Sequence, residues 1–499
     1  MNNSINSLKK EGNQQALQRQ LNPMHVWAIA FGCIIGWGSF INPGKKFLPN
    51  SGAGGTAIAM VLGALVMIVI AFSYAYMVPK YPKAGGEFTF TKACFGKKAA
   101  YICGWFLVAA YLTNVPMNST AIGLIVDGLD GSSDILKFGF HYAIAGFDVY
   151  MGEMVFAMSI LILFGILNIL GVKKAGNVQT ILAALLGISV VSLTVAALIS
   201  SEATIENLAP WWGFDKSSAV AAATNGMYQS IDEFAHSGTV SIISSILATF
   251  AIAPWAFVGF DTIPQAAEEF NFSYRKVSVI MIVAIIFGCF VYTANNTIAA
   301  AALENWPELI INSEGTPWLL LAAAEKLLGI PGKVLVGVAV SCAVLSGIMG
   351  FYLASSRLMY SMARDGYLPE SFGLIDEKRG TPKNAMIFCM LISLSGPILG
   401  REALGWFVDM SAIGASIGFG FTCLSAIVTL HRNKENNIFV KTVAYIGSAF
   451  SVVFMILQLI PIPGLNGVHF GRESYILLGV WIVIGMVFYI KQMKCFKEE

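Results

Sequence analysis

Long, nearly uninterrupted runs of apolar residues recur along the chain, and they constrain its fold more than any other feature. Each run holds about 20 residues, the length that a helix needs to cross the hydrocarbon core of a bilayer. The runs lie at residues 24–49, 56–78, 98–127, 151–171, 177–200, 240–268, 276–303, 331–362, 384–400, 403–430, 441–461 and 474–491. The sequence therefore predicts an all-α polytopic membrane protein with twelve transmembrane helices.

The charge content excludes most other classes of protein. Of the 499 residues, 56% are apolar and only 12% are charged, whereas an average soluble domain carries about 25% charged residues. The five histidines are dispersed, and no HExxH or Walker-type sequence is present. We therefore expect no enzyme, no nucleic-acid binder, no metal site and no cofactor.

The distribution of positive charge predicts how the chain lies in the membrane. If the spans alternate, 23 of the 31 Lys and Arg residues fall on one side, and cytoplasmic loops carry such an excess. We therefore expect cytoplasmic tails at 1–23 and 492–499 and a single transmembrane domain at 24–491, in the plasma membrane. The long outer connections near 128–150 and 201–239 are expected to contain short interfacial helices.

Two of the spans carry residues that interrupt helices. The first span has Gly32, Gly36 and Gly38 within seven residues, and the sixth has Pro254 and Gly259 close together, followed by a second proline. Glycine costs about 1 kcal/mol relative to alanine inside a helix, and proline removes a backbone donor. Unpaired backbone groups at membrane depth are tolerated only where protein, water or a ligand satisfies them. Both spans are therefore predicted to be broken helices.

A broken helix presents free amides on one side of the gap and free carbonyls on the other. The amide end favours an anionic group and the carbonyl end favours a cation. A zwitterion, with a carboxylate and an ammonium a few ångströms apart, fits this arrangement better than a sugar, a nucleotide or a simple ion.

The positions of the two interruptions predict an internal repeat. They are centred near residues 36 and 257, and each lies in the first helix of a run of five. Five is odd, so the second run enters the membrane in the opposite orientation. We therefore expect a 5+5 inverted repeat, at about 24–200 and 240–430, with a site near the bilayer midplane. The helices at about 441–491 are additional.

Several short sequences resemble those of the amino acid–polyamine–organocation (APC) superfamily of permeases. They are GCIIGWGSF at 32–40, PKAGGEF at 82–88, GFD at 259–261 with Glu268 and Glu269, and SR at 356–357 with ARDG at 363–366. The resemblance covers residues 24–382 and implies a LeuT-like fold with helices 1 and 6 broken. Trp37 and the segment 39–42 depart from the family pattern, which would alter the size of the pocket.

The resemblance also implies where a substrate binds. Its carboxylate would contact the amides of Gly36, Trp37 and Gly38, with the carbonyl of Ile34 or Ile35 assisting at the ammonium. The ammonium would donate to carbonyls in the sixth span, those of Trp255, Ala256 and Val258. The ring of Trp255 would also form an aromatic gate.

Further candidate residues lie on the third and eighth spans. Asn114 and Asn118 are four residues apart and share a helix face, which points either at the pocket or at a neighbouring helix. Ser346 of span eight is a candidate for side-chain selectivity. No Lys or Arg lies in the middle of a span, so neutral amino acids are favoured over aspartate or glutamate.

Charged residues suggest gating and coupling. Asp261 is an ionisable group within the sixth span and therefore a functional candidate, either as a proton-linked switch or as a helix-orienting hydrogen bond. Arg357, Lys83 and Glu87 are expected at the inner side, with Arg364 and Asp365, as an ion-pair gate or as membrane anchors. Some proton-coupled members of the family that the chain resembles have a lysine in the fifth span, and this chain has none there, which speaks against that mechanism. The sequence does not choose among proton coupling, sodium coupling and exchange.

Taken with the motifs, the resemblance implies a secondary active transporter that moves amino acids by alternating access, as a symporter or an antiporter. An amine or polyamine carrier of the same superfamily is the main alternative, and a transporter-like nutrient sensor is an alternative of another class. The expected partners are a small amino acid substrate and the lipid bilayer, with the protein a monomer or homodimer.

Overall fold

The protein folds into a bundle of helices. The computed structural model describes residues 17–130, 135–144, 147–215, 240–312, 318–400, 403–462 and 469–495, together with Ser218, Ala221 and Glu233. Within these residues, nine helices are long and apolar enough to cross a membrane, and Pro23–Ile34 and Lys383–Leu399 form shorter apolar segments. The expected polytopic all-helical class is confirmed, whereas the count of twelve spans stays a prediction. The predicted tails lie largely outside the described residues.

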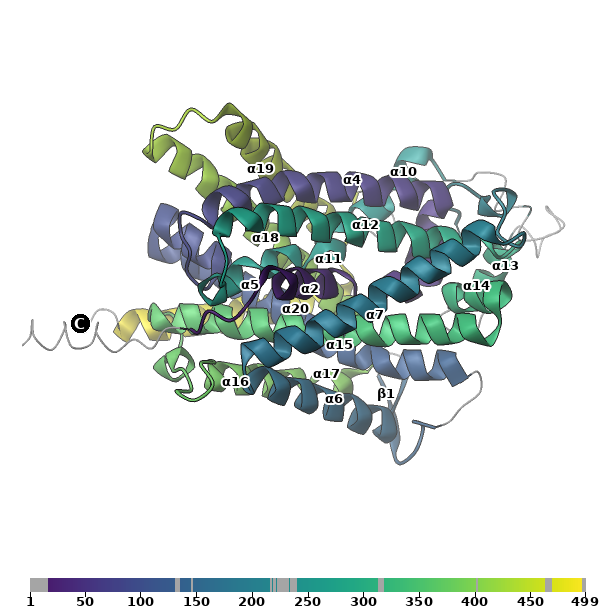
Figure 1. Ribbon diagram of the computed structural model, residues 1–499, viewed down its shortest axis with the longest axis horizontal. Coiled ribbons are helices and arrows are strands. Elements are labelled where there is room, and N and C mark those ends of the chain that lie inside the picture. The colour runs from purple at the N-terminus through teal and green to yellow at the C-terminus, as the bar shows by residue number, and fades with distance from the viewer. Residues whose placement is uncertain are drawn as a thin grey trace, which may run out of the picture.

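The longest helices run side by side along the long axis of the molecule (Figure 1). In chain order the α-helices are α2 (Pro23–Ile34), α3 (Gly38–Asn42), α4 (Leu48–Met77), α5 (Gly86–Asp130), α6 (Met151–Ile169), α7 (Val172–Ile199), α10 (Ile242–Phe250), α11 (Ala253–Phe257), α12 (Val277–Ala301), α13 (Trp306–Asn312), α14 (Leu319–Leu328), α15 (Ile330–Arg364), α16 (Lys383–Ser393), α17 (Gly396–Leu399), α18 (Ala403–Arg432), α19 (Ile438–Leu459) and α20 (Arg472–Cys495). Short 3₁₀ and π segments are η1 (Pro43–Phe47), η2 (Glu206–Leu208), η3 (Phe260–Thr262), η4 (Pro264–Glu269), η5 (Tyr274–Lys276) and η6 (Glu370–Gly373).

Glycines with positive φ divide two of these helices. Gly52 in α4 has a φ of 66° and Gly96 in α5 has a φ of 79°, a conformation that glycine adopts without the penalty of a side chain. Gly52 lies between the expected first and second spans, and Gly96 lies just before the expected third. The backbone therefore changes direction near the boundaries that hydropathy predicts.

One connection that was expected to form interfacial helices is instead partly a β-hairpin. Strands β1 (His141–Ile144) and β2 (Phe147–Tyr150) pair antiparallel. The prediction of a helix here was wrong, because each segment has only four residues and is rich in aromatic and branched side chains that favour strands. Most of the second long connection, from 216 to 239, lies outside the described residues.

The short helices α2 and α11 lie in the middle of the bundle (Figure 1). Helix α2 packs against α7, α12 and α15, and α5 packs extensively against α15 and α18. The approach of α18 to α5 depends on a glycine: a Cβ at Gly414 would lie 2.9 Å from the Ala110 Cβ and closer still to the Phe106 carbonyl oxygen. Small residues of this kind let membrane helices approach closely.

Replacing Gly414 by alanine should therefore force α18 away from α5. We expect Gly414→Ala to destabilise the protein by about 1–3 kcal/mol, the usual cost of overpacking, as a lower melting temperature in detergent. The matched control is Gly187→Ala in α7, where no atom lies within 4 Å of the added Cβ. Equal melting temperatures for the two variants would contradict the predicted contact.

Candidate functional site

The first interruption separates α2 from α3. Helix α2 ends at Ile34, and Ile35 follows with an extended backbone (φ −96°, ψ 94°) before α3 begins at Gly38. The Ile34 carbonyl accepts a hydrogen bond from the Tyr292 hydroxyl at 3.3 Å. Among the described residues no acceptor is found for the amides of Gly36 and Trp37. Two backbone donors therefore remain available at this point.

The second interruption follows α11. Helix α11 ends at Phe257, and Gly259 then adopts a φ of 146° before η3 begins. The Trp255 carbonyl accepts the Val258 amide at 3.2 Å, whereas no donor to the Ala256 or Val258 carbonyl is found within the described part of the chain. This segment therefore leaves acceptors free where the first leaves donors free.

The two interruptions touch each other. A Cβ at Gly259 would lie 2.5 Å from the Ile34 amide nitrogen and 2.8 Å from the Cys33 Cβ. A Cβ at Gly38 would overlap the ring of Trp255. Both segments therefore need a glycine to pack this closely. The free backbone donors of the first segment lie next to the free backbone acceptors of the second.

Open space lies beside Gly36. This glycine is half-buried although both its neighbours are buried, and a Cβ there would meet only the Asn118 Oδ1, at 3.4 Å. That oxygen is buried and has no hydrogen-bond partner, while the Nδ2 of Asn118 donates to the Asn114 carbonyl. Asn118 therefore presents an unsatisfied acceptor next to the free amides.

Two tryptophans line a narrow cleft. The ring centroids of Trp37 and Trp255 are 6.4 Å apart, and Lys45, Leu404 and Val408 also line the cleft. The Trp255 ring, which lines this cleft, also lies against Gly38. We call this feature the tryptophan cleft.

The other expected polar residues connect helices. Asn114 Nδ2 donates to the Ser411 hydroxyl of α18 at 2.7 Å and to the Ala110 carbonyl at 2.6 Å. Ser346 donates to the Gly32 carbonyl of α2 at 3.3 Å. Gln179 of α7 donates to carbonyls of both α2 and α15, each at 3.2 Å. Ser346 and Gln179 both lie against Gly32, just before the first interruption.

Two ion pairs join η4 to α15. We call Glu268, Glu269, Arg357 and Arg364 the inner ion-pair cluster, after the side of the membrane on which the sequence predicts the two arginines. Arg357 contacts Glu269 through two nitrogens at 2.8 and 3.2 Å, and both side chains are fully buried. Arg364 contacts Glu268 at 2.7 Å. The expected gate residues Lys83 and Glu87 are not in this cluster: Lys83 is exposed, and Glu87 bonds to Tyr74, Tyr111 and Gln265.

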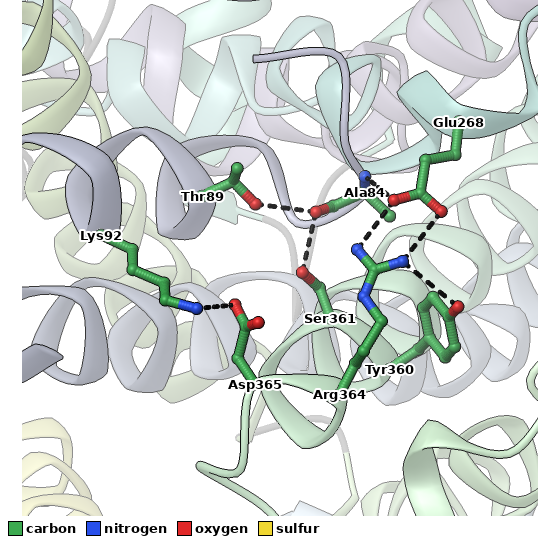
Figure 2. Close-up of polar contacts among 8 residues, drawn as sticks. All are labelled: Ala84, Thr89, Lys92, Glu268, Tyr360, Ser361, Arg364 and Asp365. Carbon is green, nitrogen blue, oxygen red and sulfur yellow. Dashed lines mark hydrogen bonds and ion pairs between the residues drawn. The ribbon is translucent and has the colours of Figure 1, made fainter. Parts of the chain in front are cut away.

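The inner ion-pair cluster also holds the turn between α4 and α5 (Figure 2). Glu268 accepts the Ala84 amide at 3.1 Å as well as Arg364. The Ala84 carbonyl in turn accepts the hydroxyls of Thr89 and Ser361, both at 2.8 Å. Hydrogen bonds at Glu268 and Ala84 therefore hold the turn, η4 and α15 together.

The segment before α2 is hydrogen-bonded to the end of η4, next to the inner ion-pair cluster. The Glu269 carbonyl accepts the amides of Gln20 and Leu21, both at 2.9 Å, and the Leu21 carbonyl accepts the Asn271 amide at 3.0 Å. The start of the first interrupted helix and the end of the second are therefore joined backbone to backbone.

Sequence reasoning quoted Glu268 and Glu269 without giving them a role, and it did not single out Tyr74, Gln179 or Gln265. One signal was available for the two glutamates. They are adjacent acids at the end of the predicted sixth span, on the side where the sequence predicts the excess of Lys and Arg, so arginine partners were to be expected.

These features describe a multi-pass helical membrane protein with two interrupted segments packed together in its interior. Residues 21–488 match the family described as amino acid permease. The chain therefore belongs to the amino acid permease family, within the APC superfamily, which is a family of membrane transporters and not of enzymes.

Relatives across the family are named as amino acid transporters. The chain is 26% identical to the Asc-type amino acid transporter 1 of Mus musculus, over 96% of this chain and 83% of the relative. It is 23% identical to a branched-chain amino acid permease of Bacillus subtilis (strain 168), over 95% and 93% of the two chains. It is 24% identical to a vacuolar cationic amino acid transporter 2 of Arabidopsis thaliana, over 86% and 62%.

Arg357 should contribute to stability through its buried partner. Arg357→Gln leaves Glu269 uncompensated, and breaking a buried pair in this way costs about 3–5 kcal/mol. We expect a large fall in the melting temperature, much of which Glu269→Gln should restore in the double variant. Lys92→Gln is the control, because the Lys92–Asp365 pair is partly exposed and its loss should cost no more than about 1 kcal/mol.

Proposed function

We propose that this protein is a secondary active transporter of neutral amino acids that works by alternating access. The observation that carries the proposal is the contact between two interrupted segments, one with free amides and the other with free carbonyls. A substrate carboxylate would bind at Gly36 and Trp37, and its ammonium at the carbonyls of Ala256 and Val258. Relatives named as amino acid transporters support this class of substrate.

The preference for neutral side chains is part of the proposal. Asn118 offers an amide oxygen beside Gly36, and neither arginine of the inner ion-pair cluster is free to bind a second carboxylate, since each contacts a glutamate. The relatives include transporters named for branched-chain and for cationic amino acids, so the family alone does not decide the side chain.

We further propose the twelve-span arrangement with both termini cytoplasmic, in the plasma membrane. The apolar stretch Gly38–Met77 has 40 residues, and Gly52 divides it. The part before Gly52 completes the first expected span, which begins in α2, and the part after Gly52 forms the second. This division, together with the interrupted α10–η4 segment, supports an inverted repeat with its broken helices at the first and sixth spans.

Alternating access would open the two sides in turn. On one side, Trp255 must move away from Gly38 to expose the amides to the tryptophan cleft. On the other, the inner ion-pair cluster must separate. Because the chain before α2 is bonded to the end of η4, we propose that these two elements move as one body, with 35–37 and 258–259 as hinges.

Ligand-induced thermal stabilisation tests the proposal. A ligand at 100 times its dissociation constant adds about 2.7 kcal/mol to the stability of the folded state. We expect a neutral amino acid to stabilise the purified protein and its decarboxylated amine not to do so. Stabilisation by amines or polyamines alone would replace the proposal with an amine carrier, and stabilisation by an amino acid that is never taken up would indicate a sensor.

Gly36→Leu should block the proposed carboxylate site. Its side chain would fill the space between the amides and Asn118, so we expect loss of both ligand stabilisation and uptake into proteoliposomes, with the protein still folded. Gly187→Leu, in open surroundings on α7, is the control and should transport normally. Normal uptake by Gly36→Leu would disprove the site.

A further inference from the structure

A second polar cluster lies beside the substrate site and takes no part in binding the substrate as proposed. Five side chains meet there from four elements, and all five are fully buried. They are Tyr74 of α4, Glu87 and Tyr111 of α5, Asp261 of η3 and Gln265 of η4. We call them the carboxylate pair cluster, because it contains two acids.

One hydroxyl group connects the two acids. The Tyr111 Oη lies 2.9 Å from the Asp261 Oδ2 and 3.2 Å from the Glu87 Oε1. The hydroxyl carries a single proton, so it can donate to only one carboxylate at a time. The other contact is a hydrogen bond only if that second carboxyl group is itself protonated and donates to the Tyr111 oxygen.

The remaining contacts divide between the acids. Glu87 accepts the Tyr74 hydroxyl at 2.8 Å and Gln265 Nε2 at 2.5 Å. Asp261 accepts the Gly259 amide at 2.7 Å. Each carboxyl group thus accepts hydrogen bonds from uncharged donors. These bonds can stabilise a negative charge on either acid when the other acid is protonated.

No positive charge compensates the pair among the residues that the structure describes. Cys33 of α2 faces Asp261, while Cys103 of α5 faces Glu87 and Thr422 of α18 faces Tyr74. The arginines on α15, Arg357 and Arg364, each contact a glutamate of the inner ion-pair cluster. Two buried anions without a cation are costly, and sharing one proton lowers the net charge of such a pair from two to one.

We propose that Glu87 and Asp261 share one exchangeable proton, relayed by the Tyr111 hydroxyl, and that this proton drives transport. In one arrangement Glu87 donates to the Tyr111 oxygen, and Tyr111 donates to Asp261. If both protons move one position along this chain, Asp261 is protonated and Glu87 carries the charge. No atom is gained or lost, and the Tyr111 hydroxyl is regenerated.

The relay connects α5 to η3, and η3 belongs to the body that would move in the proposed alternating access. Glu87 and Tyr111 belong to α5, while Asp261 lies three residues after Val258, whose carbonyl is a proposed contact of the substrate ammonium. Separation of η3 from α5 would break the relay and leave the proton on one acid. The inference rests on the proposed function and adds the proton as its coupling ion.

The test measures how far the protein concentrates its substrate in proteoliposomes with the membrane potential held at zero. With one proton per neutral substrate, an inward gradient of one pH unit stores about 1.4 kcal/mol and should give roughly tenfold accumulation at equilibrium. Tyr111→Phe, Glu87→Gln and Asp261→Asn should each bring the ratio to one, whatever their rate of transport. The control Asp409→Asn alters a carboxylate on α18 that bonds to Ser474 and should accumulate like the wild type.

A second measurement does not need transport. The infrared spectrum of the wild type at neutral pH should contain the band of a protonated carboxyl group. The double variant Glu87→Gln, Asp261→Asn should lose this band, and Asp409→Asn should keep it.

Absence of that band in the wild type, or accumulation of substrate by Tyr111→Phe, would overturn the proposal of a shared proton. A wild type that exchanges amino acids without accumulating them would also overturn it, while leaving the proposed function intact. Failure to exchange any amino acid would instead overturn the proposed function.

Discussion

Every backbone donor and acceptor at membrane depth needs a partner, and this requirement organises the interior of the protein. At the two interruptions, side chains supply part of what the missing helix would have provided: Tyr292 bonds to the Ile34 carbonyl, Ser39 to the Gly36 carbonyl and Thr262 to the Gly259 carbonyl. The groups left over are donors on one segment and acceptors on the other. Under the proposed function, a small zwitterion would satisfy both sets at once.

Two kinds of contact hold the interrupted segments in place. At one end, backbone hydrogen bonds join Leu21 to the residues that follow η4, so the halves of the two broken helices on that side form a unit. That unit is held to α15 by ion pairs between charged side chains, which can break and form again. Backbone hydrogen bonds within the unit are thus separate from the ion pairs that hold it to α15, an arrangement that would suit the proposed rocking motion.

Sequence reasoning was most successful where the physics is local. The bilayer sets the length of every span, so hydropathy alone indicates the helical class, and glycine and proline mark the interruptions without reference to other helices. Pairing between distant helices was not accessible in the same way. Arg357 lies against Glu269 and not Glu87, and Asn114 lies against Ser411, because the rotation and depth of packed helices decide these contacts. The roles of the site residues stay predictions.

The burial of Arg357 and Glu269 has a thermal consequence. Counterions do not reach a pair whose two side chains are fully enclosed, so the salt concentration of the surrounding solution has little leverage on it. Temperature does affect the stability of the pair. The hydration that these charges lose on burial becomes less favourable on warming, so the cost of burying them falls. The contact between η4 and α15 therefore gains relative stability as the temperature rises, and under the proposed function separating it would become more costly on warming.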